Sequence, residues 1–290
     1  MPGFSYDIQQ KFLAQVGTIR QIIEPLLGTE RKDKLALNLS KRSRSVICVF
    51  ENTHHSHNIS AILRTVDAFG LLETIFVYHD AQMRFRSRDS VERGASQWLL
   101  LRRAHDIEQT AKILKQAGYA LALVSLPSFA SNSQFPQQSV SSLGHFAAHT
   151  LFDGPFEKSL EGRPLALIFG SELKGISEKW IHFADFYLSV AMKGFVESLN
   201  VSVCAGILLH NLRNFYETQH RSQNLLSQSE TVLVHEYWLA RSTQHARKTI
   251  EAHDKMCLEY FDFIKGGHFF DPFPNSHCTA LQPTCPTRQA

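Results

Sequence analysis

The chain has 290 residues, of which 43% are hydrophobic and 20% are charged, a composition that is ordinary for a globular protein. No apolar run approaches the roughly 20 residues that a membrane-spanning helix needs, which argues against an integral membrane protein. The net charge of +3 is too small to indicate nucleic-acid binding by itself. Met1–Gln10 lacks the basic start and apolar centre of a signal peptide, so we expect a cytoplasmic protein.

Residues 1–44 predict a helical, basic N-terminal extension. Apolar side chains recur at helical spacing from Phe12 to Leu26, and Pro25 and Gly28 interrupt the pattern. Basic side chains then crowd the segment before the first predicted strand: Lys32, Lys34, Lys41, Arg42 and Arg44.

Strands and helices alternate from residue 45 to residue 217. Short apolar runs predict buried strands, and stretches of helical periodicity lie between them. The predicted strands are Val46–Phe50, Thr74–Tyr78, Leu121–Leu126, Leu165–Phe169 and Tyr187–Val190. The predicted helices are Asn58 to Gly70, 106–117, 178–184 and Ser198 to about Phe215, with Asn58 and Ser177 as caps. This alternation predicts an α/β fold with a mostly parallel sheet.

Two segments depart from this alternation. Residues 128–160 are rich in Ser, Gln, Pro and Phe, and they predict a long loop or insertion. After residue 217 the chain has helical character through Phe263, and residues 266–290 carry four prolines and predict a loosely attached tail. We therefore expect an N-terminal extension (1–44), an α/β domain (45–217) and a C-terminal helical extension with a tail (218–290).

A second basic segment follows the strand that is predicted at Thr74–Tyr78. It contains Arg84, Arg86 and Arg88, while Asp89 and Glu92 are the acidic residues nearby. The planar guanidinium group donates two parallel hydrogen bonds, which suits phosphate groups. A solvated charged surface is the alternative interpretation.

The first segment with chemical character is Asn58–Thr65, in the first helix of the α/β region. Asn58 lies at the positive end of this predicted helix, and Arg64 lies within two turns of it. Taken alone, this pair is more simply explained as a helix cap and a surface arginine.

The second segment, Phe169–Ser177, joins a buried strand to a helix through a loop that contains Gly170 and Gly175. Ligands of open α/β sheets bind at the carboxyl ends of strands, and glycines allow a ligand to approach the backbone closely. The segment matches neither the dinucleotide pattern nor a P-loop, so a plain connecting loop is the alternative.

The third segment, Met192–Val203, also leads from a strand through a glycine-containing loop into a helix. Ser198 and the free N–H groups of the first helical turn are suited to holding an anion such as a phosphate. A capped helix without a ligand is the alternative.

Together, the three segments resemble the SpoU family of RNA 2′-O-methyltransferases, within the SPOUT superfamily. The matching residues are Asn58, Arg64 and Thr65, then Phe169–Glu172 with Gly175–Ser177, then Ser198–Ser202. The run His57–Gly70 is similar to the TrmH-type tRNA guanosine 2′-O-methyltransferases, which also carry helical extensions at both ends. The resemblance covers about residues 45–217.

This resemblance implies an α/β domain whose C-terminal part forms a trefoil knot, a feature that hydrophobic periodicity cannot indicate. It also implies a homodimer with the helix from Ser198 at the interface, where Ala205 and Gly206 would permit close packing. The implied cofactor is S-adenosylmethionine, bound through backbone groups of the knot's loops. The residues that correspond to those loops are Val124, Ser125, Gly170, Val190, Met192 and Leu199.

The implied reaction is methyl transfer to a ribose 2′-hydroxyl of RNA, with guanosine 18 of tRNA as the favoured acceptor. The family's pivotal arginine matches Arg64, which we interpret as an electrostatic clamp because a guanidinium is not readily deprotonated. The other implied catalytic residues are Asn58, Glu172, Ser198 and Asn200, which would hold the phosphate, the ribose and the arginine. The residues expected to contact RNA phosphates are Arg42, Arg44, Arg84, Arg86 and Arg88.

Two alternatives stay open at this point. In the first alternative, the enzyme methylates ribosomal RNA or another position of tRNA. In the second alternative, the chain is a catalytically silent RNA-binding paralogue. The reaction requires no metal. His54, His55 and His57 form a cluster, but no cysteine or carboxylate lies beside them at a ligand spacing, so we expect no metal site.

Overall fold

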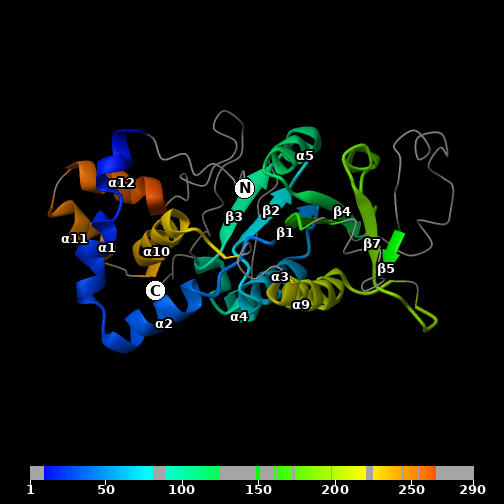
Figure 1. The fold of residues 1–290 in the computed structure, drawn as a ribbon, viewed down its shortest axis with the longest axis horizontal. Helices are drawn as coiled ribbons and strands as arrows, with labels where there is room; N and C mark the ends of the chain where they lie inside the picture. The colour runs from blue at the N-terminus through cyan, green and yellow to red at the C-terminus, as the bar shows by residue number, and fades with distance from the viewer. Residues whose placement is uncertain are drawn as a thin grey trace, which may run out of the picture.

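The computed structural model describes residues 10–80, 89–124, 148–150, 160, 162–171, 174–196, 198–219, 225–242, 245–253 and 255–265. Figure 1 shows two parts: a sheet with helices on both faces, and a group of helices from both ends of the chain that lies beside it. None of the described helices is long and apolar enough to cross a membrane.

Within the described residues the sheet has seven strands in the order β3-β2-β1-β6-β4-β7-β5, and every neighbouring pair is parallel. The strands are β1 (Val46–Glu51), β2 (Glu73–Val77), β3 (Leu100–Ala104), β4 (Ala120–Val124), β5 (Ala148–Thr150), β6 (Leu165–Phe169) and β7 (Phe186–Ser189). This confirms the predicted α/β fold with a parallel sheet. Both faces of such a sheet are covered, which is why the central strands β1, β6 and β4 have almost continuously apolar sequences.

Helices α3 (Ser56–Ala68) and α9 (Val201–Gln219) pack against each other on one face of the sheet (Figure 1). Helix α5 (Ile107–Gln116) covers the opposite face. Of three shorter elements, α4 (Asp89–Glu92) and η3 (Ala95–Gln97) contact α3, and η4 (Glu178–Trp180) contacts α5. Each face therefore has its own hydrophobic core, and the strands contribute alternate side chains to each.

Several predicted boundaries differ from the structure. Helix α3 begins at Ser56, so Asn58 lies inside its first turn and is not the cap. Helix α9 begins at Val201 rather than at Ser198. The Ser177 hydroxyl caps no helix, and a single 3-10 turn follows it. The predicted loop at 128–160 contains the strand β5, and the rest of it lies mostly outside the described residues.

The remaining elements come from the two ends of the chain and share a third hydrophobic core. They are η1 (Gln10–Gln15), α1 (Thr18–Ile23), η2 (Glu24–Leu26), α2 (Thr29–Leu39), α10 (Gln228–Ser242), α11 (Ala246–Glu251) and α12 (Lys255–Lys265). We call this group the helical module. Its core includes Phe12, Ile19, Trp238 and Tyr260, so the N-terminal and C-terminal extensions pack against each other. The predicted tail, residues 266–290, lies outside the described residues.

Glu236 holds three helices of this module together. Its buried carboxylate accepts hydrogen bonds from the backbone N–H groups of Gly17 and Arg20, each at 3.1 Å, and from the Tyr260 hydroxyl at 2.5 Å. The first two donors belong to the start of α1, so a carboxylate from α10 satisfies N–H groups that the helix leaves unpaired. Burial raises the pKa of Glu236, and these hydrogen bonds oppose the shift.

Two arginines that we expected to contact RNA phosphates lie inside the protein instead. Arg42 is 4% exposed, donates to the Leu71 carbonyl at 2.7 Å and forms an ion pair with Asp67. The Arg44 side chain is 14% exposed and pairs with Glu230 of α10. Removing such cations from water is costly, so each keeps a carboxylate partner. Both side chains lie where the helical module meets the sheet. Our prediction that Arg42 and Arg44 contact RNA phosphates is therefore corrected. Arg84, Arg86 and Arg88 lie outside the described residues.

We predict that Glu236→Ala lowers the free energy of unfolding by about 2–4 kcal/mol, because it leaves buried donors without an acceptor. Urea unfolding followed by circular dichroism measures this change. Glu251→Ala is the matched control, since this carboxylate is 55% exposed on α11. Equal stability of the two variants would contradict the structural role of Glu236.

Ionisation of the same group gives a pH dependence of known sign. Burial raises the pKa of Glu236, so protonation favours the folded state. The contribution of Glu236 to the free energy of unfolding is complete below its ordinary pKa of about 4.3. It is lost as the pH rises through the higher pKa that Glu236 has in the folded state. Glu236→Gln cannot ionise and should lack this loss when unfolding is measured from pH 4 upward.

Candidate functional site at the carboxyl edge of the sheet

The three motif segments follow β1, β6 and β7, and they leave the sheet at the same edge. Phe50 pairs with Phe169, and Val124 pairs with Phe169 on one side and with Leu188 on the other. Because all these strands are parallel, the chain leaves each of them in the same direction. The loops that follow β1, β4, β6 and β7 therefore open at one edge, where ligands of open α/β sheets bind.

A hydrogen bond joins the first and third motifs. Asn200 Nδ2 donates to Asn58 Oδ1 at 3.1 Å, between residues that are 142 positions apart. The other side of the Asn200 amide caps α9, because its Oδ1 accepts from the Ser202 N–H at 2.8 Å and from the Ser202 hydroxyl at 2.6 Å. This contact brings together two predicted site residues and fixes the start of α9 against α3.

Arg64 lies on the exposed side of α3, on the same helix as Asn58. No hydrogen bond or ion pair connects its guanidinium to the part of the chain that the structure describes. Ser198 is exposed as well, two residues before Asn200. Glu172, the remaining predicted catalytic residue, lies outside the described residues. Arg64 is thus a cation at the site that is available for an external anion.

The second motif closes on itself after β6. The Ser171 N–H donates to the Gly175 carbonyl at 3.0 Å, and the Gly175 N–H donates back to the Ser171 carbonyl at 2.9 Å. A Cβ atom on Gly170 would lie 2.1 Å from the carbonyl carbon of Gly175. The sequence suggested that a glycine here admits a ligand, but in the structure the loop's own backbone takes that space.

Glu51 is a residue of this site that our motif-based prediction missed. It ends β1, and its 1% exposed carboxylate accepts from the Ser177 N–H at 2.9 Å and from the Ser177 hydroxyl. His79 Nε2 lies 2.9 Å from the same carboxylate. Glu51 thereby ties the second motif to the end of β1. An acidic residue directly after the apolar run Val46–Phe50 was the available signal.

Most of the predicted cofactor-binding residues surround the ends of β4, β6 and β7. Val124, Gly170, Val190, Met192 and Leu199 are all partly exposed, and Val124 and Val190 also pack against the core. Residues 191–196 form no backbone–backbone hydrogen bond with any described residue. Their N–H and C=O groups are therefore available to a ligand, as binding through the backbone requires. Ser125 lies outside the described residues.

The outward side of α9 and the loop before it expose apolar side chains. Phe195 and Val196 are fully or largely exposed, and Val203 and Ile207 project from α9. Ala205 is buried, however, and a Cβ on Gly206 would lie 4.0 Å from Thr65 of α3. Ala205 therefore packs within the chain, which corrects our expectation that it permits close packing at a subunit interface, while Gly206 is partly exposed.

The fold and this edge define an open, parallel α/β protein with a candidate ligand site at the carboxyl ends of β1, β4, β6 and β7. Residues 45–210 match the model of the SpoU rRNA Methylase family. This match covers more than half of the 290 residues, and the chain belongs to that family.

Known relatives agree with this family. A tRNA (guanosine(18)-2′-O)-methyltransferase of Aquifex aeolicus is 26% identical over 228 residues, which are 78% of this chain and 97% of the relative. The protein of the same name from Thermus thermophilus is 30% identical over 62% of this chain and 79% of its own length. The crystal structure of the A. aeolicus TrmH/SpoU tRNA modifying enzyme has a TM-score of 0.58 and 23% identity over 74% of this chain and 97% of that chain, which shows a shared fold.

We predict that Gly170→Ala destabilises the protein by about 1–3 kcal/mol, because the added methyl group forces the loop at Gly175 to move. Thermal unfolding measures this loss. Gly28→Ala is the matched control, since Gly28 has φ of −65° and nothing within 4 Å of an added Cβ. A Gly170→Ala protein as stable as the control would contradict the observed loop geometry.

We also predict that Glu51→Ala lowers the free energy of unfolding by about 1–3 kcal/mol, because the partly buried Ser177 donors lose their acceptor. Glu108→Ala removes a carboxylate that is 61% exposed in a surface ion pair, and it should change stability by less than about 1 kcal/mol. Chemical unfolding of both variants gives the comparison. Equal effects would show that Glu51 does not tie the loop to β1.

Proposed function

We propose that the chain transfers a methyl group from S-adenosylmethionine to a ribose 2′-hydroxyl of RNA, and that guanosine 18 of tRNA is the acceptor. The observation that carries this proposal is the Asn200–Asn58 hydrogen bond, which joins two motifs of the SpoU family beside the available cation of Arg64. Family membership over residues 45–210 supports the reaction class. The names of the A. aeolicus and T. thermophilus relatives support the choice of tRNA.

The residues at the edge of the sheet fit the cofactor. Half-buried Val124 and Val190 give apolar contact, and the backbone of residues 191–196 offers donors and acceptors that no described residue uses. When bound, S-adenosylmethionine supplies a methyl group on a positively charged sulfur, so the reaction needs alignment and activation of the hydroxyl. Val124, Gly170, Val190, Met192 and Leu199 would hold it, together with Ser125.

Arg64 acts in this proposal as a permanent cation. A guanidinium keeps its charge in proteins, so Arg64 binds the phosphate beside the reacting ribose or the negative charge that develops on the 2′-oxygen. Asn58 and Ser198 help to position that phosphate, and Asn200 holds Asn58. Glu172 completes the proposed set. Fixed charge that is directed at the developing anion is often the largest single contribution to catalysis.

A homodimer and a trefoil knot are finer parts of this proposal. The exposed apolar side chains of Phe195, Val196, Val203 and Ile207 support association through the outward side of α9. The contribution of β4, β6 and β7 to one edge fits the proposed threading of the loops that follow them. Sedimentation of the full chain tests the dimer.

The decisive experiment is methylation of separate deproteinised tRNA and rRNA with labelled S-adenosylmethionine, followed by mass-spectrometric mapping of the modified nucleotide. A 2′-O-methylated guanosine 18 in tRNA supports the proposal. Methylation of rRNA or of another tRNA position replaces the substrate and retains the chemistry. Binding of RNA without binding of the cofactor would overturn the enzymatic assignment.

We predict that Arg64→Ala lowers the rate of methyl transfer by about 100-fold or more, while calorimetric affinity for S-adenosylmethionine changes little. Arg64→Lys should recover part of the rate, because it restores the charge without the planar fork. Arg247→Ala, an exposed arginine of the helical module, is the charge-matched control. Normal turnover by Arg64→Ala would remove this arginine from the mechanism.

A further inference from the structure

A cavity of about 300 Å³ lies where the helical module meets the sheet domain. Its walls come from α2, from the segment that joins α2 to β1, from the end of α3, and from two tryptophans. It is separate from the loops that follow β4, β6 and β7. The volume is at the lower end of the range for small-molecule sites and suits a single base or nucleoside.

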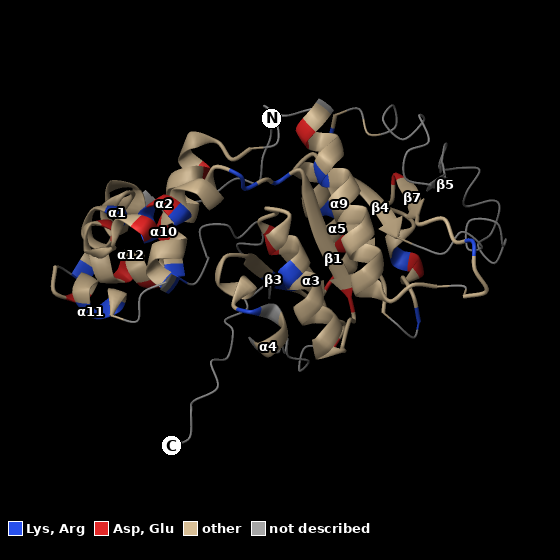
Figure 2. Ribbon diagram, turned by 90° about the horizontal axis from the view of Figure 1, so that it is seen from below, with Lys and Arg blue, Asp and Glu red and all other residues tan. Residues whose placement is uncertain are grey.

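One wall is a regular stripe of polar side chains on α2. Arg31, Lys34 and Asn38 occupy positions i, i+3 and i+7, so they project from the same side of the helix. All three residues are exposed. Figure 2 shows charged residues gathered over α2 and α10 at this end of the molecule. The stripe places donors and positive charge at the opening of the cavity.

The charge of the cavity is positive after its internal ion pair is counted. Its lining contains the cations Arg31, Lys34 and Arg42 and the carboxylate Asp67. Arg42 and Asp67 pair with each other and neutralise one another. Lys34 is exposed on α2 at the opening of the cavity, and its positive charge favours an anionic ligand such as a phosphate group.

Another wall is aromatic. Trp98 and Trp238 meet edge to face with 5.5 Å between ring centroids, and the Trp238 indole N–H donates to the Trp98 carbonyl at 3.1 Å. The Arg42 guanidinium lies 5.0 Å from the Trp238 ring centroid. The Trp238 side chain is buried, while Trp98 is partly exposed. Aromatic faces beside cations are a common arrangement for binding unstacked bases.

Helix α3 connects this cavity to the site at the sheet edge. Asp67 lines the cavity, and Arg64 precedes it by three residues, or about 4.5 Å of helix rise. An RNA strand with its ribose at Arg64 would therefore pass the cavity within a short distance. This position favours a part of the same RNA as the ligand over an unrelated small molecule.

We propose that this cavity is a subsite for one unpaired nucleotide of the RNA substrate, with the base against Trp98 and the phosphate on Lys34. The proposal rests on the proposed function in taking RNA as the ligand. It adds a contact outside the SpoU motifs, formed jointly by the N-terminal and C-terminal extensions with α3. Such a subsite would read the presence of an unstacked nucleotide near the methylated one.

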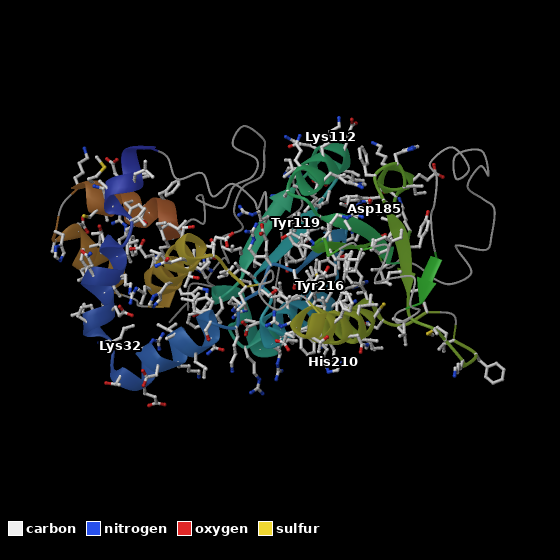
Figure 3. All side chains as sticks on the ribbon, viewed as in Figure 1. Lys32, Lys112, Tyr119, Asp185, His210 and Tyr216 are labelled. Carbon is white, nitrogen blue, oxygen red and sulfur yellow. The ribbon has the colours of Figure 1, made fainter. Side chains whose placement is uncertain are left out.

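The salt dependence of tRNA binding tests the phosphate contact. Lys34→Ala should reduce the slope of log affinity against log salt concentration by about 0.7–0.9, the value for one released counterion. Lys32→Ala is the matched control, because Lys32 lies on the same helix (Figure 3) but lines a different cavity. Equal slopes for the two variants would overturn the subsite.

Ultraviolet cross-linking of tRNA that contains 4-thiouridine tests the base contact. Peptide mapping of the wild-type protein should place a cross-link at Trp98, and Asn38→Ala with Lys34→Ala should reduce its yield severalfold while Lys32→Ala does not. Thermal unfolding of every variant confirms that the exposed substitutions leave the fold intact. Cross-links confined to other peptides would overturn the base contact.

Methylation of the same tRNA separates this inference from the proposed function. If the wild type methylates tRNA and Lys34→Ala raises KM for tRNA at unchanged kcat, both are supported. If the wild type methylates tRNA and Lys34→Ala behaves as the control, only the subsite fails. If the wild type binds tRNA with the predicted slope change but never methylates RNA, only the enzymatic proposal fails.

Discussion

Parallel pairing of the strands is the constraint on which the rest of this structure depends. Because β1, β6, β4 and β7 are neighbours that run in one direction, their following loops must open at one edge. The Asn200–Asn58 hydrogen bond then links the helices that leave two of these loops. Glu51 does the same between the end of β1 and Ser177. The site is thus assembled by hydrogen bonds between segments far apart in sequence.

The helical module is attached through buried charge. Arg42 and Arg44 lie in the segment that enters the sheet, and they pair with Asp67 of α3 and Glu230 of α10. Such pairs contribute little net stability, but loss of one partner is costly, so they specify how the two parts fit. The Tyr237 hydroxyl and the Trp238 indole add hydrogen bonds to backbone carbonyls beside β3. The cavity beside Trp98 is a consequence of this junction.

Hydrophobic patterning predicted the sheet class and five strands, because buried parallel strands are short, continuous apolar runs. It missed β5, a strand of three residues within the predicted loop, and β3, where Arg102 and Arg103 interrupt the apolar run. Arg102 is accommodated by its buried ion pair with Glu73, and the Arg103 guanidinium lies over the Tyr78 ring. The motifs predicted a shared site, but the contact between Asn58 and Asn200 spans 142 positions and has no local signal. The burial of Arg42 could not be predicted either, because a buried arginine and an exposed arginine have the same sequence pattern around them.

The Glu236 contact with Gly17 spans 219 residues, which has a consequence for synthesis on the ribosome. The strands of the sheet emerge long before α10 exists, so α1 cannot bind the carboxylate that completes its first turn until translation nears its end. Until then Phe12, Ile19 and Ile23 lack the apolar partners that α10, α11 and α12 supply. A chain truncated before α10 would expose apolar side chains of its N-terminal segment. Quality-control proteases and chaperones could recognise incomplete chains by this exposed apolar surface.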